Sequence, residues 1–199
     1  YSNILKTVKA GIISGKDADG NFYPRDNITR AEAVAMISRL MASEEELSGT
    51  SAYSDVSDSS WYCGNVAYME KSGLLEYFKD EFKPQQPITR AEFVYLVNNI
   101  SAVSNNIELN FTDTDENHPL YGCITDAVKN GIINGYEDNT IRPDDLITRA
   151  EAVAIINRAL KRCALPVSFT GAKTVEFSDV NSSHWAYCHI VEASSNHSA

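Results

Sequence analysis

The stretch Ile28-Thr29-Arg30-Ala31-Glu32 decides the fold of this chain, because the same five residues occur twice more, as Ile88–Glu92 and Ile147–Glu151. The copies are about 60 residues apart, and self-similarity at a fixed period of this size indicates a repeat architecture. The surrounding sequence repeats as well, since a proline lies four residues before each isoleucine. We therefore interpret the chain as tandem copies of one unit.

Each copy of the motif predicts the start of a helix. Hydrophobic residues follow at helical spacing, as Val34, Ile37 and Leu40 do after the first copy. The threonine is a good N-cap, and the glutamate three residues later completes a capping box. The predicted capping pairs are Thr29 with Glu32, Thr89 with Glu92, and Thr148 with Glu151. With a shorter amphipathic stretch upstream, each unit is predicted to be a short helix, a loop and a longer helix.

The chain contains three units and part of another. We assign the repeats to residues 1–50 (lacking the start of the unit), 51–108 and 109–172. Residues 173–199 begin a further unit, because Phe177-Ser178-Asp179-Val180 matches Tyr53-Ser54-Asp55-Val56, and we expect this segment to complete the first repeat. One unit is too small to bury its own apolar face. The sequence thus predicts one all-α, pseudo-threefold domain of helix-loop-helix repeats around a central helical bundle.

Charge and hydropathy exclude two classes of partner. The net charge is −10 over 199 residues, with no basic patch, which argues against nucleic acid. Apolar runs such as Ala152–Ile156 are far too short to span a bilayer, so no membrane insertion is expected. The chain starts at Tyr1 without a methionine or a signal-like run, and we expect it to be a piece of a longer protein.

No metal or cofactor is expected from the sequence. The four cysteines are scattered and form no zinc pattern with the histidines; buried free thiols are the simplest interpretation, with one disulfide as the alternative. The segment Asp17-Ala18-Asp19-Gly20-Asn21 resembles a calcium loop but lacks the first aspartate and the closing glutamate. An Asx-rich turn is therefore expected there.

The arginine of the motif is not explained by helix formation. Arg30, Arg90 and Arg149 occupy the first helical position, where the helix dipole disfavours a cation by about 0.3–1 kcal/mol. One explanation is a salt bridge to a neighbouring carboxylate, either the glutamate of the motif or a repeated aspartate. The other is an anion site, in which free N–H donors of the helix N-terminus and the guanidinium grip a ligand carboxylate.

The combined pattern resembles the S-layer homology repeat, three of which usually make one cell-wall-anchoring domain. The elements that carry the resemblance are Phe177-Ser178-Asp179-Val180, Trp185, Gly131-Ile132-Ile133-Asn134-Gly135, Phe22-Tyr23-Pro24 and the Ile-Thr-Arg-Ala-Glu motif. The resemblance covers nearly the whole chain. It implies an extracellular module, at the cell wall or S-layer of a bacterium, that binds secondary cell wall polysaccharide noncovalently in grooves between repeats. In many members the polymer carries pyruvate ketals, whose carboxylates suit the motif arginine.

The resemblance also implies which residues contact the sugar. The motif arginines are the main contacts, and Gly15 and Gly135 let the sugar approach the backbone. Trp61 and Trp185 match the aromatic position of the family; tryptophan is a common sugar platform, yet a core position is the more frequent role. The repeated aspartates orient an arginine or, as the safer interpretation, cap the short helix. These aspartates are Asp55, Asp113 and Asp179.

Two positions depart from the family pattern. Tyr77 stands where the other repeats have Gly15 and Gly135, its loop is shorter, and a tyrosine does not adopt a positive φ cheaply. Pro119 stands at the position of Trp61 and Trp185. We therefore predict fewer than three equivalent grooves, with the groove that contains Tyr77 weakest or closed.

Two functions other than wall binding make different demands on the sequence. A structural protein–protein module for surface-layer lattice assembly would need an exposed apolar patch. An acidic glycoside hydrolase would need two carboxyls about 5–9.5 Å apart in different environments, whereas the repeated glutamates already have a capping role. The sequence therefore predicts no catalytic activity, and a cell wall polysaccharide as the partner.

Overall fold

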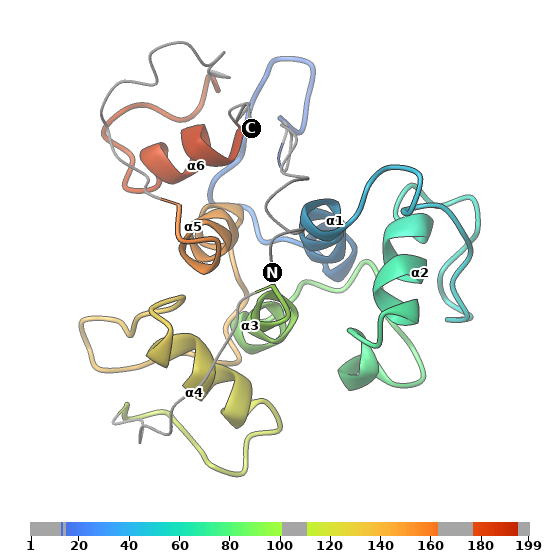
Figure 1. Cartoon of the computed structure of the whole chain (residues 1–199). Coiled ribbons are helices and arrows are strands. Elements are labelled where there is room, and N and C mark those ends of the chain that lie inside the picture. The colour runs from blue at the N-terminus through green and yellow to red at the C-terminus, as the bar shows by residue number, and fades with distance from the viewer. Residues whose placement is uncertain (1–12, 14, 101–110, 163–176, 195–199) are drawn as a thin grey trace.

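The computed structural model describes residues 13, 15–100, 111–162 and 177–194, and within them the chain is helical, with only isolated β-bridges besides the helices. The three helices that begin at the motif, α1, α3 and α5, stand at the centre, and α2, α4 and α6 surround them (Figure 1). We call the central three the long helices, although α3 has nine residues, as α2 and α4 do, so the predicted longer helix is present only in the first and third repeats. The elements are α1 Arg30–Met41, α2 Cys63–Lys71, the 3₁₀ turn η2 Glu76–Phe78, α3 Arg90–Asn98, α4 Tyr121–Lys129, α5 Arg149–Ala159 and α6 Tyr187–Ser194. The predicted all-α, pseudo-threefold class is confirmed.

Each long helix begins at the arginine of the motif, and the predicted capping box is present in all three. The threonine side chain accepts a hydrogen bond from the N–H of the glutamate, and the glutamate carboxylate accepts one from the N–H of the threonine. In α1, for example, the Glu32 N to Thr29 Oγ1 distance is 3.2 Å and the Thr29 N to Glu32 Oε2 distance is 2.9 Å. Local sequence therefore defines where the long helices start.

The isoleucines of the three motifs join the repeats in a closed ring of backbone hydrogen bonds. Ile28 donates to the carbonyl of Ile147 (3.2 Å), Ile88 to that of Ile28 (3.0 Å), and Ile147 to that of Ile88 (3.2 Å). All three side chains are buried. Because each repeat both donates to one neighbour and accepts from the other, the ring fixes the three helix starts around the pseudo-threefold axis.

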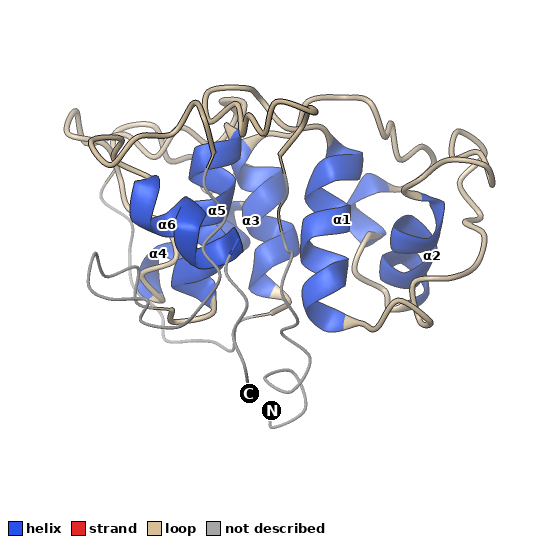
Figure 2. Cartoon of the chain, turned by 90° about the horizontal axis from the view of Figure 1, so that it is seen from above, coloured by secondary structure: helices blue, strands red, loops and turns tan. Residues whose placement is uncertain are grey.

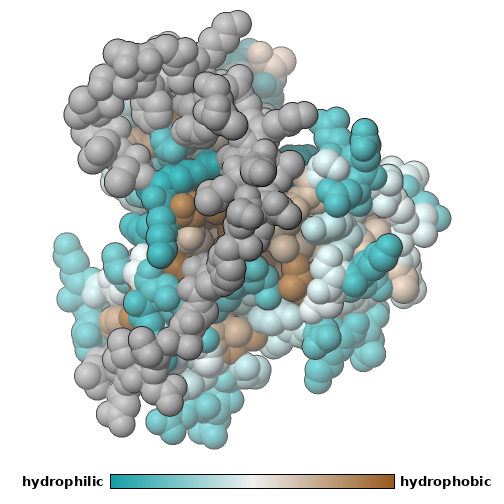
Figure 3. All heavy atoms as spheres, viewed as in Figure 1, coloured by the Kyte–Doolittle hydropathy of each residue, from teal (hydrophilic) through white to brown (hydrophobic). Residues whose placement is uncertain are grey.

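The hydrophobic core lies between the long helices and the short helices outside them. The predicted stripe residues Val34, Ile37, Val94, Val97 and Ile156 are fully buried. Each short helix packs on the preceding long one (α2 on α1, α4 on α3, α6 on α5), and α3 contacts both α1 and α5. On the face shown in Figure 3, hydrophobic residues gather near the centre, and hydrophilic ones occupy the rim.

The last described segment contacts the loop of the first repeat. The Asp179 carboxylate accepts hydrogen bonds from the N–H groups of Phe22 (2.7 Å) and Tyr23 (2.6 Å). Asp55 does the same for Phe82 and Lys83 within the second repeat. These contacts support our proposal that residues 173–199 complete the first repeat, whose expected short helix near Ile4 lies outside the described residues.

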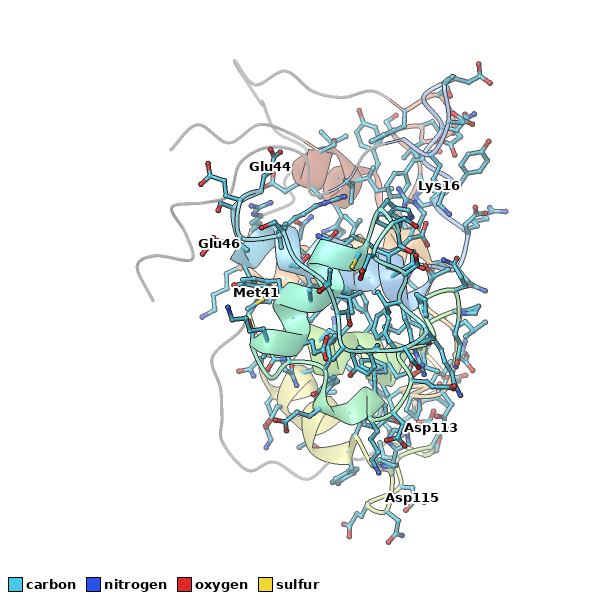
Figure 4. The ribbon with its side chains drawn as sticks, turned by 90° about the vertical axis from the view of Figure 1, so that its right-hand side faces the viewer. Lys16, Met41, Glu44, Glu46, Asp113 and Asp115 are labelled. Carbon is cyan, nitrogen blue, oxygen red and sulfur yellow. The ribbon has the colours of Figure 1, made fainter. Side chains whose placement is uncertain are left out.

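The loops that precede the long helices gather at one end of the bundle (Figure 2). Lys16, Asp113 and Asp115 lie at that end, whereas Met41, at the end of α1, lies at the opposite one (Figure 4). The expected Asx-rich turn is present among these loops, since the N–H of Gly20 donates to the Asp17 carbonyl (3.3 Å) and the Asp17 carboxylate accepts from the N–H of Asn21 (2.9 Å). No helix in the described residues is long and apolar enough to cross a membrane.

Three of the four cysteines fall in the described residues. Cys63 is buried, Cys123 and Cys188 are half-buried, and all three are free thiols. Burial raises the pKa of the Cys123 thiol, which disfavours the reactive thiolate. Cys163 lies outside the described residues.

Candidate functional site

The N–H donors that open each long helix already have partners. In α3 the N–H of Arg90 donates to the carbonyl of Asp145 (2.8 Å), the N–H of Ala91 to Pro143 (2.9 Å), and the N–H of Glu92 to Thr89 Oγ1 (3.2 Å). The other two long helices are bonded in the same way by the loop of a neighbouring repeat. The expectation of free N–H donors for a ligand is therefore wrong, because the next repeat supplies carbonyl oxygens at that place.

Each motif arginine reaches across to the loop of the next repeat and lies over an aromatic ring there. The guanidinium carbon is 4.8 Å from the ring centre of Phe78 for Arg30 and 5.3 Å from that of Tyr136 for Arg90. Arg149 lies 4.6 Å from the ring centre of Phe22, and its Nε donates to the Phe22 carbonyl (2.9 Å). These cation–π contacts and carbonyl acceptors compensate the unfavourable place of the cation at the positive helix end.

Arg30 forms the salt bridge that was one of the two explanations. Its Nη2 lies 2.6 Å from Glu92 Oε1, and only 10% and 8% of the two side chains are exposed. The carboxylate belongs to the motif glutamate of the next copy, not to Glu32 of the same copy, and not to a repeated aspartate. Arg30 also donates to the Phe82 carbonyl (3.1 Å), so much of its hydrogen-bonding capacity is used inside the protein.

Arg90 is held differently. Its Nη2 donates to the Asn134 carbonyl (3.1 Å), its buried Nε has no hydrogen-bond partner, and no ion pair is formed with any described residue. The equivalent glutamate, Glu151, instead accepts from the hydroxyl of Tyr136 (2.9 Å) and from Thr148. Burial alone raises the pKa of Glu151, but these hydrogen bonds, with a smaller contribution from the charge of Arg90, outweigh it and leave the pKa below its usual value. Arg90 therefore keeps a charge without a bonded carboxylate.

The repeated aspartates hold the loops. Asp55, Asp113 and Asp179 each accept two backbone hydrogen bonds, and the second donor in each pair is a residue with positive φ. These second donors are Lys83 (φ 54°), Arg142 (φ 54°) and Tyr23 (φ 56°). The helix-capping interpretation is wrong, because α2 has no side-chain cap and both carboxylate oxygens of Asp55 accept hydrogen bonds from loop N–H groups. No hydrogen bond joins these aspartates to a motif arginine among the described residues.

The loop glycines are needed for close packing and not for a backbone with positive φ. A Cβ on Gly135 would overlap the ring of Phe111, and one on Gly15 would lie 3.2 Å from the Asn21 carbonyl oxygen, yet neither residue has positive φ. Tyr77, at the equivalent place, enters η2 without positive φ, and its N–H lies 3.4 Å from the Tyr95 hydroxyl. The expected strain at Tyr77 is therefore absent, since the shorter loop takes a helical turn there.

Both tryptophans lie on the surface. Trp61 is 61% exposed and Trp185 is 60% exposed, so the interpretation of this position as core is wrong. Trp185 is stacked on His184, with the ring centres 5.9 Å apart and the rings inclined by 28°. An exposed, braced indole is suited to packing against a sugar ring.

Two grooves follow from these placements. The α5 groove, a cavity of about 970 Å³, is lined by four of the residues predicted to contact the sugar, Arg90, Gly135, Asp179 and Trp185. The α3 groove, of about 750 Å³, is lined by Arg30 and Tyr77, with Pro119 at the place that Trp185 occupies in the α5 groove. Arg149, Gly15 and Trp61 belong by repeat position to the equivalent site at α1.

Several groove residues were not singled out from the sequence. Tyr136 and His184 line the α5 groove, and so does Arg158 near the end of α5. Arg158 follows Glu151 by two helical turns, so helical spacing from the motif glutamate could have identified it. Tyr136 follows Gly135 directly, but its contact with Arg90 joins two repeats and has no local signal.

The chain is similar to known bacterial surface proteins. The S-layer homology domain model matches residues 1–34, 52–94 and 110–153. Cell surface glycoprotein 1 of Acetivibrio thermocellus is 36% identical over 194 residues, covering 90% of this chain and 8% of that protein. The cellulosome-anchoring protein of the same bacterium is 36% identical over 189 residues, covering 90% of this chain and 41% of that protein.

A third relative is the surface-layer 125 kDa protein of Lysinibacillus sphaericus, which is 31% identical over 164 residues, covering 79% of this chain and 14% of that protein. The chain therefore spans less than half the length of each of these relatives. The three matched segments begin close to the predicted repeat boundaries and include all three copies of the motif. The chain belongs to the S-layer homology domain family.

Proposed function

We propose that this chain anchors its parent protein to the bacterial cell wall by binding an anionic, pyruvylated wall polysaccharide in grooves between repeats. Membership of the family places it outside the cell, at the cell wall or surface layer. The anchoring role agrees with the name of the cellulosome-anchoring relative. The polysaccharide and its ketal carboxylate are what the family resemblance implies, and the chemistry of the grooves supports them.

The arrangement of Arg90 in the α5 groove is the observation that carries this proposal. Its guanidinium has no bonded carboxylate among the described residues, and it lines the same cavity as the exposed Trp185. A ketal carboxylate could accept charge-assisted hydrogen bonds from Arg90 while the sugar ring packs on the indole. Cationic and aromatic contacts side by side suit an acidic sugar better than a neutral one.

The α3 groove is proposed to be the weak one. Arg30 is already bonded to Glu92, so a ligand carboxylate would have to compete with a buried ion pair. The groove is lined by Tyr77, and Pro119 replaces the aromatic platform. We therefore still predict unequal grooves. The main reason is now the Arg30–Glu92 ion pair, because the expected backbone strain at Tyr77 is absent.

Hydrolysis does not suit the carboxylates of the α5 groove. A glycosidase needs one carboxylic acid with a raised pKa to protonate the leaving group. The pKa of Glu151 is lowered instead, and both Asp179 oxygens accept loop N–H groups. We therefore propose binding without catalysis for this chain.

Sedimentation with purified cell walls tests this function. The chain is expected to co-sediment with intact walls, and to stay in the supernatant when the wall polysaccharide has been extracted or its ketals removed by mild acid. Binding that survives both treatments would contradict the proposal. Sedimentation of the chain by itself would favour the alternative of lattice assembly.

A further inference from the structure

The α5 groove collects positive charge on an acidic chain. Arg25, Arg90 and Arg158 line it from three different elements, and the only carboxylates in its lining are Glu151 and Asp179. Both carboxylates accept hydrogen bonds from the protein itself. On a chain with a net charge of −10, this is a local surplus of cations that have no ion pair with any described residue.

No contact within the described fold explains why an arginine stands at position 158. It lies near the end of α5, two turns after Glu151 and on the same side of the helix, and it is half-buried. Within the described parts of the chain no hydrogen bond or ion pair holds its guanidinium. Burial lowers its pKa, and the charge of Arg90 lowers it further, so the two guanidinium groups repel each other across the groove. A bound anion would relieve that repulsion.

The other repeats do not repeat this pair. The same helical position holds Arg39 in α1, which is exposed, and Asn99 at the end of α3. The α3 groove is lined by as many carboxylates as cations, namely Asp80, Glu81 and Glu92 against Arg30, Lys79 and Lys83. The repeat therefore does not require a second cation in its groove. In the α5 groove the cations outnumber the carboxylates, whereas in the α3 groove the two are equal in number.

We propose that Arg158 is a second anion contact of the α5 groove, and that the preferred ligand is a saccharide with two carboxylates, one bound by Arg90 and one by Arg158. This inference rests on the proposed function, because it takes the α5 groove as the wall-polymer site. Two carboxylates neutralise two guanidinium groups that otherwise repel, and each pair can form two parallel hydrogen bonds. His184 and Trp185, which line the same groove, provide the sugar platform.

Calorimetry with two synthetic disaccharides tests the inference. One disaccharide carries a single pyruvyl ketal and the other carries a ketal on each sugar. The unmodified chain is expected to bind the doubly charged disaccharide about tenfold more tightly, the effect of one added charge-assisted hydrogen bond. In Arg158→Gln this advantage is expected to disappear while affinity for the singly charged disaccharide is unchanged. Arg158→Lys is expected to keep part of the advantage.

Arg39→Gln is the matched control, because it removes the equivalent arginine from the exposed side of α1 and should leave both affinities unchanged. Equal binding of the two disaccharides by the unmodified chain would overturn the inference, and so would an equal loss for both in Arg158→Gln. If the chain binds neither disaccharide nor the intact walls, the proposed function fails as well. Wall binding without discrimination between the disaccharides refutes only the second contact.

Discussion

The three motif arginines occupy the same position in their repeats but have different partners. Arg30 is bonded to the buried carboxylate of Glu92, whereas Arg90 faces a groove where Glu151 is bonded to Tyr136 instead. The difference arises at one residue, because the second repeat has Phe78 where the third has Tyr136, and a phenylalanine has no hydroxyl to donate. This one aromatic difference therefore accompanies the difference in whether the motif arginine of the preceding repeat has a bonded carboxylate.

A stability difference between two alanine variants is the first consequence. Arg30→Ala leaves Glu92 buried without its cation and is expected to lower the free energy of unfolding by about 3 kcal/mol. Arg90→Ala removes a hydrogen bond to a carbonyl, a ring contact and a weak charge attraction to Glu151, but breaks no ion pair, so a loss of about 1 kcal/mol is expected. Urea unfolding of both variants measures the difference, and equal losses would contradict the assignment of partners.

His189 is expected to make stability depend on pH. Burial, and then the charge of Arg158, lowers its pKa below 6.5, the usual value for histidine. The unfolded chain therefore binds a proton more readily than the folded one. The contribution of His189 to the free energy of unfolding is complete above pH 6.5, and it is lost as the pH falls below 6.5 towards the pKa of the folded state. Urea unfolding at pH 7.5 and 5.5 is expected to show a smaller loss for His189→Gln than for the unmodified chain. An unchanged loss would show that His189 is not responsible.

At the scale of elements, each loop is fixed by one aspartate that binds two neighbouring amides. In the third repeat Asp113 accepts from Ile141 and Arg142 (2.7 Å each), and Arg142 has positive φ. The contact ties the start of a repeat to the loop before its own long helix. It therefore shapes the loop that Arg90, the motif arginine of the preceding repeat, contacts.

Removing this contact is expected to loosen the loop. Asp113→Ala deprives two amides of a charged acceptor, and a loss of about 2–3 kcal/mol in the free energy of unfolding is expected. Faster amide hydrogen exchange is expected at Ile141 and Arg142. Asp115→Ala is the matched control, because Asp115 lies at the same end of the molecule (Figure 4) and bonds only within its own turn, to Asn117. Equal effects of the two substitutions would contradict the role of Asp113.

Local features of the fold were predictable from the sequence, and contacts between repeats were not. The helix starts and capping boxes depend on residues three apart, and hydrophobic spacing identified buried positions such as Val34 and Val153. The partner of Arg30 lies in the next repeat, so no local pattern indicated it. The exposure of Trp61 was also missed, because a recurring tryptophan is compatible with either a core or a surface position.

At the scale of the whole molecule, the ring of isoleucine hydrogen bonds makes the three repeats one unit. A groove therefore combines parts of different repeats: the α5 groove takes Arg90 from the second, Tyr136 from the third, and Trp185 from the last segment. Binding should depend on the intact domain, since a single repeat supplies only part of any groove. Because the ring of hydrogen bonds is closed, it creates three similar groove positions, whose side chains differ from one repeat to the next.

The overall charge predicts an unusual salt dependence of wall binding. Chain and polymer would both be anionic, so long-range steering opposes association, and only short-range contacts in the groove favour it. The affinity is expected to be nearly independent of salt, or to improve slightly as salt rises. Titrations of the chain with wall polymer at low and physiological salt measure this, and a steep loss of affinity at the higher salt would refute it.

Calorimetry of the three single variants Arg30→Ala, Arg90→Ala and Arg149→Ala with a pyruvylated saccharide tests the central claim most directly. At a working groove the lost charge-assisted hydrogen bond is expected to weaken binding by about 1.5–3 kcal/mol. Arg90→Ala should show this loss, and Arg30→Ala should leave the binding free energy of the folded chain nearly unchanged, because its guanidinium is already bonded to Glu92. Three equal losses of affinity would contradict the account.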